Sequence, residues 1–341
     1  MAKRFIIIFI LLCTALIDIN LLIAKTDEEI KYQIRLEKRQ EYCSNNHIVF
    51  FYSQDFIQPF EDIDPKNINS VSELYCMATF YEDEGKLDAA MQSYKSILNL
   101  EPQFIDILIK VGDFYKNSYF NNYDMAIIYY NDAIKNIDNY LTNNISFLKA
   151  YTETYDKIID IYKNLKLNND AIKKYDDILT KLENMLKNPA YTNSIDLITT
   201  SKIKYLLGKA AISKKNDAIK IYENILFDID PNNKEAIKQL AQTYYELGLL
   251  NETKALLEYT PVDNLLLGKV YFDLGEYDKA FDTFNTILKS NSNNAEAYYY
   301  RGQIYLIKGS CNKAKNDFQK AKSINPEIVK QKGFDWSNLK C

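Results

Sequence analysis

The chain has 341 residues, with nine glycines, seven prolines and one histidine, His47. So few glycines argue against folds built on glycine-rich phosphate loops or tight hairpins, and a single histidine excludes histidine-rich metal sites and most imidazole catalysis. Its 42 basic and 46 acidic side chains give a net charge of −4, which does not supply the positive field that nucleic-acid binding requires. We therefore expect a mostly helical protein that does not bind nucleic acid, with no metal, no cofactor and no catalytic residue.

The first 24 residues are predicted to be a signal peptide or a signal anchor. A basic start precedes an apolar run over residues 5–17, whose length of about 13 residues matches the apolar region of a secretory signal better than a membrane span of about 20. Cleavage is expected after Ala15 or Ala24, and an uncleaved anchor over residues 5–24 is the alternative. In both interpretations the rest of the chain lies outside the cytoplasm, as a secreted, periplasmic or membrane-anchored protein.

Four cysteines remain beyond that segment: Cys43, Cys76, Cys311 and Cys341. Four cysteines allow three pairings, and an exported chain can form disulfides. Pairing Cys43 with Cys76 and Cys311 with Cys341 would staple the two ends of the chain, whereas free thiols are the alternative. The sequence has no CxxC spacing, so we expect no zinc or redox site.

Residues 25–70 do not share the pattern that begins at residue 71 and are predicted to be an N-terminal cap or an irregular segment. The stretch HIVFFYSQDFIQPFEDIDP, residues 47–65, is rich in aromatic side chains. It is interpreted as a loop or a pairing segment. It could cover the first unit of the array, since terminal units need their exposed apolar face covered.

A pattern of six positions recurs at fixed spacing in the segments Leu74–Pro102 and Ala297–Pro326. Each segment has a small residue, a tyrosine three residues later and a glycine four after that, followed by an alanine, an aromatic residue and a closing proline. In the two segments these are Ala78 and Gly302, Tyr81 and Tyr305, Gly85 and Gly309, Ala90 and Ala314, Tyr94 and Phe318, and Pro102 and Pro326. The pattern resembles the tetratricopeptide repeat, a helix–turn–helix unit of about 34 residues.

Each position has a mechanical role in such a unit. The small residue and the alanine lie where two helices cross, because larger side chains would push the helix axes beyond the usual separation of about 8–10 Å. The tyrosine and the later aromatic residue fill the space between the helices. The middle glycine ends the first helix in a left-handed conformation, and the proline stops the second helix.

Five further copies lie between these two segments. The second copy carries Leu108, Gly112, Tyr115, Ala126, Tyr130 and Ala133; the third Tyr155, Ile159, Tyr162, Ala171, Tyr175 and Ile178; the fourth, whose first helix is expected to be short, Leu207, Gly208, Ala218, Tyr222 and Pro231; the fifth Ala241, Tyr244, Gly248 and Leu257; and the sixth Gly268, Tyr271, Gly275, Tyr277, Ala280 and Phe284. Repeats 1–3 are expected over residues 71–186 and repeats 4–7 over residues 202–326. An interruption at 187–201, where Pro189 stands beside a Ser and Thr cluster, separates them, and a tail over 327–341 follows. The resemblance implies an all-α fold, a right-handed α-solenoid of about seven helix pairs.

The resemblance also implies a function. In this family the first helix of every unit lines a concave groove that binds peptides or partner proteins, so we expect a non-catalytic interaction scaffold outside the cytoplasm. The alternative is a membrane-anchored structural subunit of an envelope assembly or export complex. We expect no small-molecule substrate, since residues 26–70 and the tail are too short to build a catalytic pocket.

Groove positions are assigned by the helical period relative to the small residue of each unit. They predict an acidic half in the first three units and an apolar, aromatic half in the last four. The acidic candidates are Glu82, Asp83, Asp106, Asp113, Asp156 and Asp160, and the aromatic candidates are Tyr245, Phe272 and Tyr299. The predicted partner carries basic residues next to hydrophobic ones; the alternative is an ordinary solvated face whose aromatic residues belong partly to the core.

Overall fold

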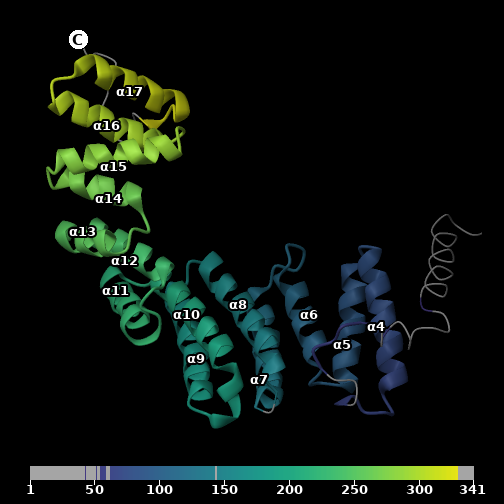
Figure 1. Cartoon of the computed structure of the whole chain (residues 1–341). Helices are drawn as coiled ribbons and strands as arrows, with labels where there is room; N and C mark the ends of the chain where they lie inside the picture. Colours follow the sequence, from purple (N-terminus) through teal and green to yellow (C-terminus); the bar gives the residue numbers. More distant parts are fainter. Residues whose placement is uncertain (1–42, 44–50, 52–53, 59–61, 143, 329–341) are drawn as a thin grey trace, which may run out of the picture. The chain divides into compact units, whose positions relative to one another are not determined.

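The computed structural model describes residues 43, 51, 54–58, 62–142 and 144–328, and all of its regular elements over these residues are helices (Figure 1). The predicted targeting segment, His47, Cys341 and most of the C-terminal tail lie outside the described residues. Within the described ranges, no helix is both long enough and apolar enough to cross a membrane. The fold is an α-solenoid of helix pairs, as the sequence predicts.

The chain forms two units, residues 1–165 and residues 166–341, which we call unit 1 and unit 2. The described part of unit 1 contains α4 (Ile68–Asp83), α5 (Leu87–Leu100), α6 (Ile105–Lys116), α7 (Tyr123–Leu141) and α8 (Leu148–Asn164), with a 3-10 turn at Ile145–Phe147 before α8. Helices that follow one another in the chain pack side by side. We call α4, α6 and α8 first helices and α5 and α7 second helices, according to their place in the predicted repeats.

First and second helices also alternate along the chain in unit 2. It contains α9 (Asn168–Leu186), a 3-10 turn (Pro189–Ser194), α10 (Ile195–Ile212), α11 (Lys215–Asn224), a π-helical turn (Ile225–Ile229), α12 (Lys234–Glu246), α13 (Leu250–Tyr259), α14 (Asn264–Asp273), α15 (Tyr277–Ser290), α16 (Ala295–Ile307) and α17 (Cys311–Ile324). Here α10, α12, α14 and α16 are first helices, and α9, α11, α13, α15 and α17 are second helices.

Several of these helices begin at a side-chain cap. The side chains of Asn122, Asn233, Asp263 and Asn294 each accept the backbone N–H three residues further on. Each cap satisfies one of the N–H groups that a helix leaves unpaired at its start. Asn and Asp side chains in the short turns therefore fix where these helices begin.

At the helix crossings, the small residue of a first helix packs against an aromatic ring of the second helix. A Cβ added to Gly112 would lie 2.5 Å from the ring of Tyr130, and one added to Gly268 would lie 2.7 Å from the ring of Phe284. The alanines at the equivalent crossings, Ala78, Ala90, Ala126, Ala280 and Ala314, are fully buried. Gly85, Gly248, Gly275 and Gly309, at the turns, have φ between 70° and 77°, and Pro326 follows the end of α17. The core thus lies between first and second helices.

The break between repeats differs from the expected one. Residues 195–201 form the start of α10, which has 18 residues and is not short. The hydroxyl groups of Thr200 and Ser201 donate to backbone carbonyls four residues earlier, so this Ser and Thr cluster is satisfied inside a helix. The boundary between the units falls instead after Leu165, within the third predicted repeat.

One of the disulfides that the sequence suggested is present. Cys43 is bonded to Cys76 of α4. Cys311 at the start of α17 is also disulfide-bonded. The chain segment that precedes α4 is therefore fastened covalently to that helix.

Candidate functional site

In unit 2, side chains of neighbouring first helices meet on one side. Tyr245 of α12 donates its hydroxyl group to Asp273 of α14, with an O···O distance of 2.7 Å. Lys269 of α14 forms an ion pair with Glu296 of α16 at 2.8 Å. We call the surface that these side chains line the first-helix face of unit 2.

Unit 1 has the same arrangement between its own first helices. Lys110 of α6 pairs with Glu82 of α4 at 2.8 Å, and Lys157 of α8 pairs with Asp113 of α6 at 2.6 Å. We call this surface the first-helix face of unit 1. Each of these pairs joins a predicted groove carboxylate to a lysine of the next first helix.

A second-helix tyrosine completes each of these pairs in unit 1. The hydroxyl group of Tyr94 donates to Glu82 at 2.9 Å, and that of Tyr130 donates to Asp113 at 2.6 Å. Burial, together with the neighbouring carboxylate, raises the pKa of both tyrosines far above its usual value, so both stay protonated donors. Each carboxylate is thus held by a phenol from its own repeat and a lysine from the next.

The expected acidic half of the groove needs correction for this reason. Glu82 and Asp113 are neutralised by Lys110 and Lys157, which the chosen groove positions had omitted. Lys110 lies two residues before Gly112, and Lys157 lies two residues before Ile159, which stands at the small-residue position of the third repeat. Each lysine lies on the side of its helix that faces the carboxylate it meets. Of the other candidates, Asp83 and Asp160 are exposed and Asp156 is half-buried.

Asp106 is engaged by the N-terminal segment of the chain. Its carboxylate accepts the backbone N–H groups of Ile57 at 2.7 Å and Gln58 at 3.0 Å. The side-chain carbonyl of Gln58 in turn accepts the N–H of Ile105, at the start of α6. Burial raises the pKa of Asp106, while the two backbone donors oppose that shift. We call Phe51 and residues 54–58 the strap.

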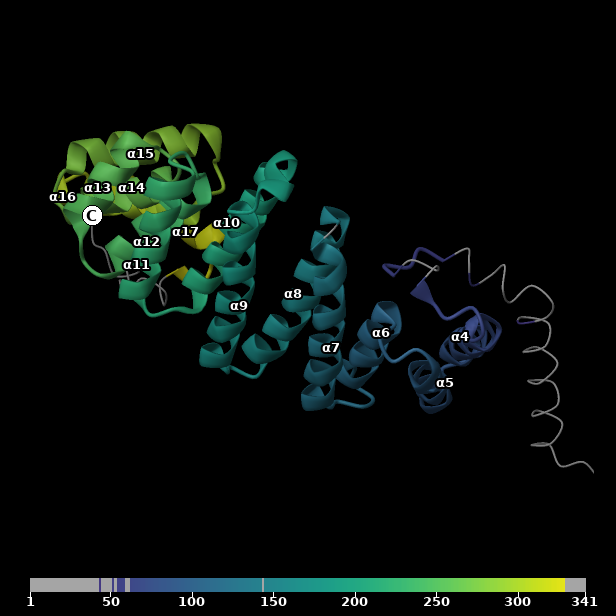
Figure 2. The ribbon, with the colours of Figure 1, turned by 90° about the horizontal axis from the view of Figure 1, so that it is seen from below.

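The strap also contributes rings to an aromatic cluster. Phe51 and Phe56 lie 5.6 and 5.2 Å from Tyr75 of α4, centroid to centroid, and 6.3 and 5.5 Å from Phe104. Figure 2 shows this purple segment next to α4 and α6. The strap therefore contacts the part of the first-helix face of unit 1 that Tyr75 and Asp106 form.

The three aromatic candidates of unit 2 have different environments. Tyr245 is half-buried on the first-helix face. Phe272 is half-buried against Tyr277 and Tyr300. Tyr299 is only 3% exposed and packs against Phe318 in the core of the last repeat. Tyr299 is therefore a core residue, because α17 and Ile328 close over that side of α16.

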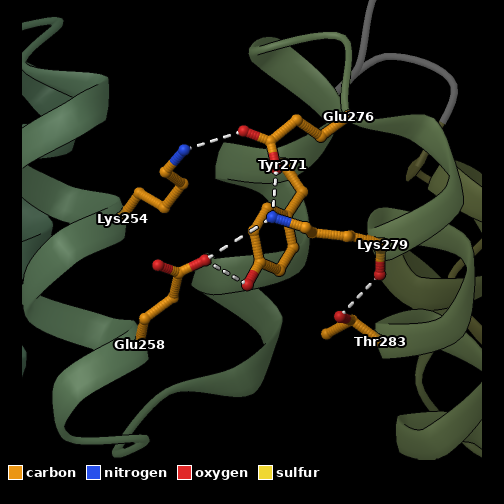
Figure 3. Close-up of polar contacts among 6 residues, drawn as sticks. All are labelled: Lys254, Glu258, Tyr271, Glu276, Lys279 and Thr283. Atoms are coloured by element: carbon orange, nitrogen blue, oxygen red, sulfur yellow. Dashed lines mark hydrogen bonds and ion pairs between the residues drawn. The ribbon is translucent and has the colours of Figure 1, made fainter.

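A separate polar network connects second helices of unit 2 (Figure 3). Glu276 pairs with Lys254 of α13 and with Lys279 of α15, both at 2.8 Å. The hydroxyl group of Tyr271 donates to Glu258 of α13 at 2.8 Å, and burial together with that carboxylate raises the pKa of Tyr271 to about 12. The two lysines lower the pKa of Glu276. This network links α13 to α15 and does not include the pairs of the first-helix face.

A buried charge in the last repeat has a structural partner. Asp317 of α17, 6% exposed, accepts two hydrogen bonds of 2.7 Å from the guanidinium group of Arg301 on α16. This bidentate pair fixes α16 to α17. Among the residues that the structure describes, no group of three His, Cys, Asp or Glu side chains is arranged to hold a metal ion.

Family models match both ends of the repeat array. The model described as TPR repeat matches residues 268–309, and the one described as Tetratricopeptide repeat matches residues 74–104 and 295–328. A TPR repeat-containing protein of Methanocaldococcus jannaschii is 22% identical over 256 residues, which cover 75% of this chain and 38% of the relative. The chain thus spans little more than a third of that relative's length.

Solved structures of repeat proteins align with most of the chain. The C-terminal part of a TPR repeat-containing protein from Cytophaga hutchinsonii covers 76% of this chain and 98% of its own, with 14% identity and a TM-score of 0.48. A tetratricopeptide repeat protein from Parabacteroides merdae covers 77% of this chain and 97% of its own, with 22% identity and a TM-score of 0.32. The matched repeats indicate a protein–protein interaction scaffold.

Proposed function

Because the chain is a tetratricopeptide repeat protein, we propose that it is a non-catalytic scaffold that binds a segment of a partner protein on its first-helix faces, outside the cytoplasm. The observation that carries this proposal is the contact between side chains of successive first helices. Tyr245 with Asp273 and Lys269 with Glu296 form one surface across three repeats. A stacked array offers an extended segment such a surface at every repeat.

The partner segment is proposed to bind mainly through apolar and aromatic contacts. In unit 1, Glu82 and Asp113 already have lysine and tyrosine partners, and Asp106 accepts the strap. The exposed acidic candidates are Asp83 and Asp160. Electrostatic attraction therefore adds less affinity for a strongly basic partner than the sequence suggested. Binding should consequently change little when salt is raised, because screening mainly affects exposed charges.

A pull-down with the full chain tests the proposed face. We expect the double variant Tyr245→Ala/Lys269→Ala to retain about tenfold less partner than the unaltered chain, since residues near the centre of an interface contribute most of its affinity. The matched control is Lys254→Ala/Lys279→Ala, which instead removes the two lysines that pair with Glu276 in the network of Figure 3. Partner recovery is measured by quantitative mass spectrometry, at low and at high salt. Equal retention by both variants would overturn the proposal.

The location outside the cytoplasm is supported by the Cys43–Cys76 disulfide, because disulfides persist in oxidising compartments. Alkylation of the native protein before reduction, followed by N-terminal sequencing, checks the bond and the fate of residues 1–24 together. Modification of both cysteines without prior reduction would count against export. Release from membranes by high salt without detergent would count against the anchored-subunit alternative.

A further inference from the structure

The strap contacts the first-helix face of unit 1 as a bound peptide would. It gives two successive backbone N–H groups, those of Ile57 and Gln58, to the carboxylate of Asp106. Backbone donors are present in every non-proline residue, so this contact does not depend on the side chains at those two positions. The rings of Phe51 and Phe56 supply the side-chain contacts, on Tyr75 and Phe104.

We propose that this face is a recognition site for a partner segment whose turn brings together two aromatic residues five positions apart, the second followed by two residues with free backbone N–H groups. In the strap, the rings of Phe51 and Phe56 lie 5.0 Å apart and the N–H group of Gln54 donates to the carbonyl of Phe51. The strap holds the site until such a segment replaces it. This inference rests on the proposed function in assuming that a first-helix face binds partner segments. It adds which features of a partner segment unit 1 recognises, and it explains why the strap occupies the site in the free protein.

The acceptor at the centre of the site requires an occupant. Asp106 is half-buried, accepts two backbone N–H groups, and has its pKa raised by burial. A desolvated carboxylate without donors is costly, because the protein does not replace the hydrogen bonds that water would give it. The strap supplies two donors, and any segment that displaces it must supply them too. Replacement by a matching segment is therefore favoured over simple exposure of the site.

The middle of the strap is more exposed than its two ends. Phe51 and Gln58 are buried, whereas Phe56 and Ile57 are half-buried and Asp55 is exposed. The polar contacts to α6 include the two N–H groups on Asp106 and the bond from Ile105 to Gln58. An entering segment would thus meet the strap first at Asp55 and Phe56.

The strap does not fill the site. A cavity of about 320 Å³ lies between Phe56 and Ile57 on one side and Phe147 and Glu153, near the start of α8, on the other. A second cavity of about 150 Å³ lies between residues 54–56 and α4 and α6. A partner segment with larger side chains beside its second aromatic residue can bury more surface here than the strap does.

The disulfide gives the strap an advantage over free segments. Cys43 is bonded to Cys76 on α4, so the chain is fastened to unit 1 on both sides of the strap. A tethered ligand acts at an effective concentration in the millimolar range. A free peptide of the same sequence should therefore fail to displace the strap from the unaltered chain.

Fluorescence anisotropy of a labelled peptide FYSQDFIQ, the sequence of residues 51–58, tests the proposal. We compare the unaltered full chain with the released variant Phe51→Ser/Phe56→Ser, in which the strap has lost both rings. The released variant is expected to bind the peptide at least about tenfold more tightly, because its own strap no longer competes from a tether.

Matched peptides identify the contacts that matter. AYSQDAIQ lacks both rings, and FYSQDFPQ lacks the N–H group that Ile57 supplies; each is expected to bind the released variant at least about tenfold less tightly than FYSQDFIQ. Equal binding of all three peptides, equal binding to both chains, or no binding to a folded released variant would each overturn the proposal. A chain with Tyr245→Ala/Lys269→Ala and the released strap should bind FYSQDFIQ as the released variant does, so this test and that of unit 2 can fail separately.

Folding of the released variant is checked by circular dichroism. If it loses helix, the variant Cys43→Ser/Ile57→Pro is used instead, because it keeps both rings and removes the tether and one N–H donor. Tighter binding of FYSQDFIQ by this second variant than by the unaltered chain supports replacement of the strap by a partner segment. If the second variant also loses helix, the strap is a fixed part of the core and the proposal is wrong.

Discussion

Gly302 and Gly309 show two separate demands that one repeat makes on glycine. A Cβ added to Gly302 on α16 would lie 2.8 Å from the ring of Phe318 on α17, closer than ordinary contacts allow. Gly309, in the following turn, has open space around it, but its φ is 71°. The first glycine is required by a close approach of two helices and the second by a left-handed backbone.

Substituting each glycine by alanine should separate these demands. Gly302→Ala is expected to lower the free energy of unfolding by about 1–3 kcal/mol, because the Phe318 ring or the helix must move. The double variant Gly302→Ala/Phe318→Leu should recover part of this loss. Gly309→Ala should cost about 1–2 kcal/mol through its backbone alone. Urea unfolding of the full chain measures all three changes.

The control for that comparison is Phe318→Leu combined with Gly309→Ala. Its two effects should add, because the turn glycine does not touch the ring. Recovery of stability in this combination would contradict the two separate roles.

Glycine positions could be predicted from sequence, and the pairs of the first-helix face could not. A crossing or a turn imposes a local requirement that recurs in every copy, so Gly85 and Gly302 could be assigned from spacing alone. The pair between Lys110 and Glu82 joins two repeats. Its formation depends on how far one helix is displaced against the next, and on the reach of a flexible lysine, neither of which a one-dimensional pattern contains.

At the scale of elements, α9 and α10 pack against each other across the predicted interruption. A Cβ added to Gly208 of α10 would lie 2.6 Å from the hydroxyl oxygen of Tyr175 on α9, and the ring of Tyr175 lies 6.1 Å from that of Tyr205. Gly112 and Gly268 instead meet rings of the second helix that follows them in the same repeat. In the fourth repeat, the glycine of the first helix, Gly208 of α10, therefore packs against a ring of the preceding helix, α9.

Tyr175→Ala should destabilise unit 2 selectively. Removing a buried aromatic side chain leaves a cavity and is expected to cost about 3 kcal/mol. Amide hydrogen exchange should then become faster in α9 and α10, with little change in α6 and α7. Tyr130→Ala is the matched control in unit 1, where the opposite distribution is expected. Faster exchange spread evenly over both units in either variant would contradict this assignment.

Pro189 explains why the predicted interruption at 187–201 includes the start of α10. Proline and clustered hydroxyl residues predict a break, and a 3-10 turn does occur at Pro189–Ser194. A helix can begin directly after such a turn, however, and the hydroxyl groups of Thr200 and Ser201 bond to its own backbone. A breaker predicts where one helix ends more reliably than where the next begins.

At the scale of the whole chain, the sequence predicted the array but neither the boundary after Leu165 nor the individual contacts of the N-terminal segment. Each repeat mainly contacts its neighbours, so a fixed period predicts the array from local information. The boundary after Leu165 and the contact of Phe56 with Phe104 depend on distant parts of the chain. The cysteine pairing could be proposed because only three arrangements were available.

Tyrosine–carboxylate contacts recur in both units and predict how the protein responds to alkali. The pKa of Tyr271 and that of Tyr244 are each raised to about 12, mainly by burial and then by Glu258 and Glu223. A pKa that is higher in the folded than in the unfolded chain stabilises the fold fully below the unfolded value of about 10, and this contribution is lost as the pH rises toward 12. We expect helix to be lost cooperatively in that interval, as measured by circular dichroism.

Glu258→Gln is the variant that checks the cause. It removes the negative charge beside Tyr271 and should lower the pKa of that phenol, so that it ionises at lower pH. Smooth ionisation near pH 10 with the helices intact would contradict the prediction for the unaltered chain.

The same phenols make the protein its own optical reporter. Tyrosinate absorbs at longer wavelength than tyrosine, and Tyr94, Tyr130, Tyr244, Tyr245 and Tyr271 each donate a hydrogen bond to a carboxylate within the array. Their absorbance should therefore remain that of neutral phenol until the repeat around each one opens. Single Tyr→Phe variants would then assign each step of an alkaline absorbance curve to one repeat, so that the order of opening along the chain can be followed without an added label.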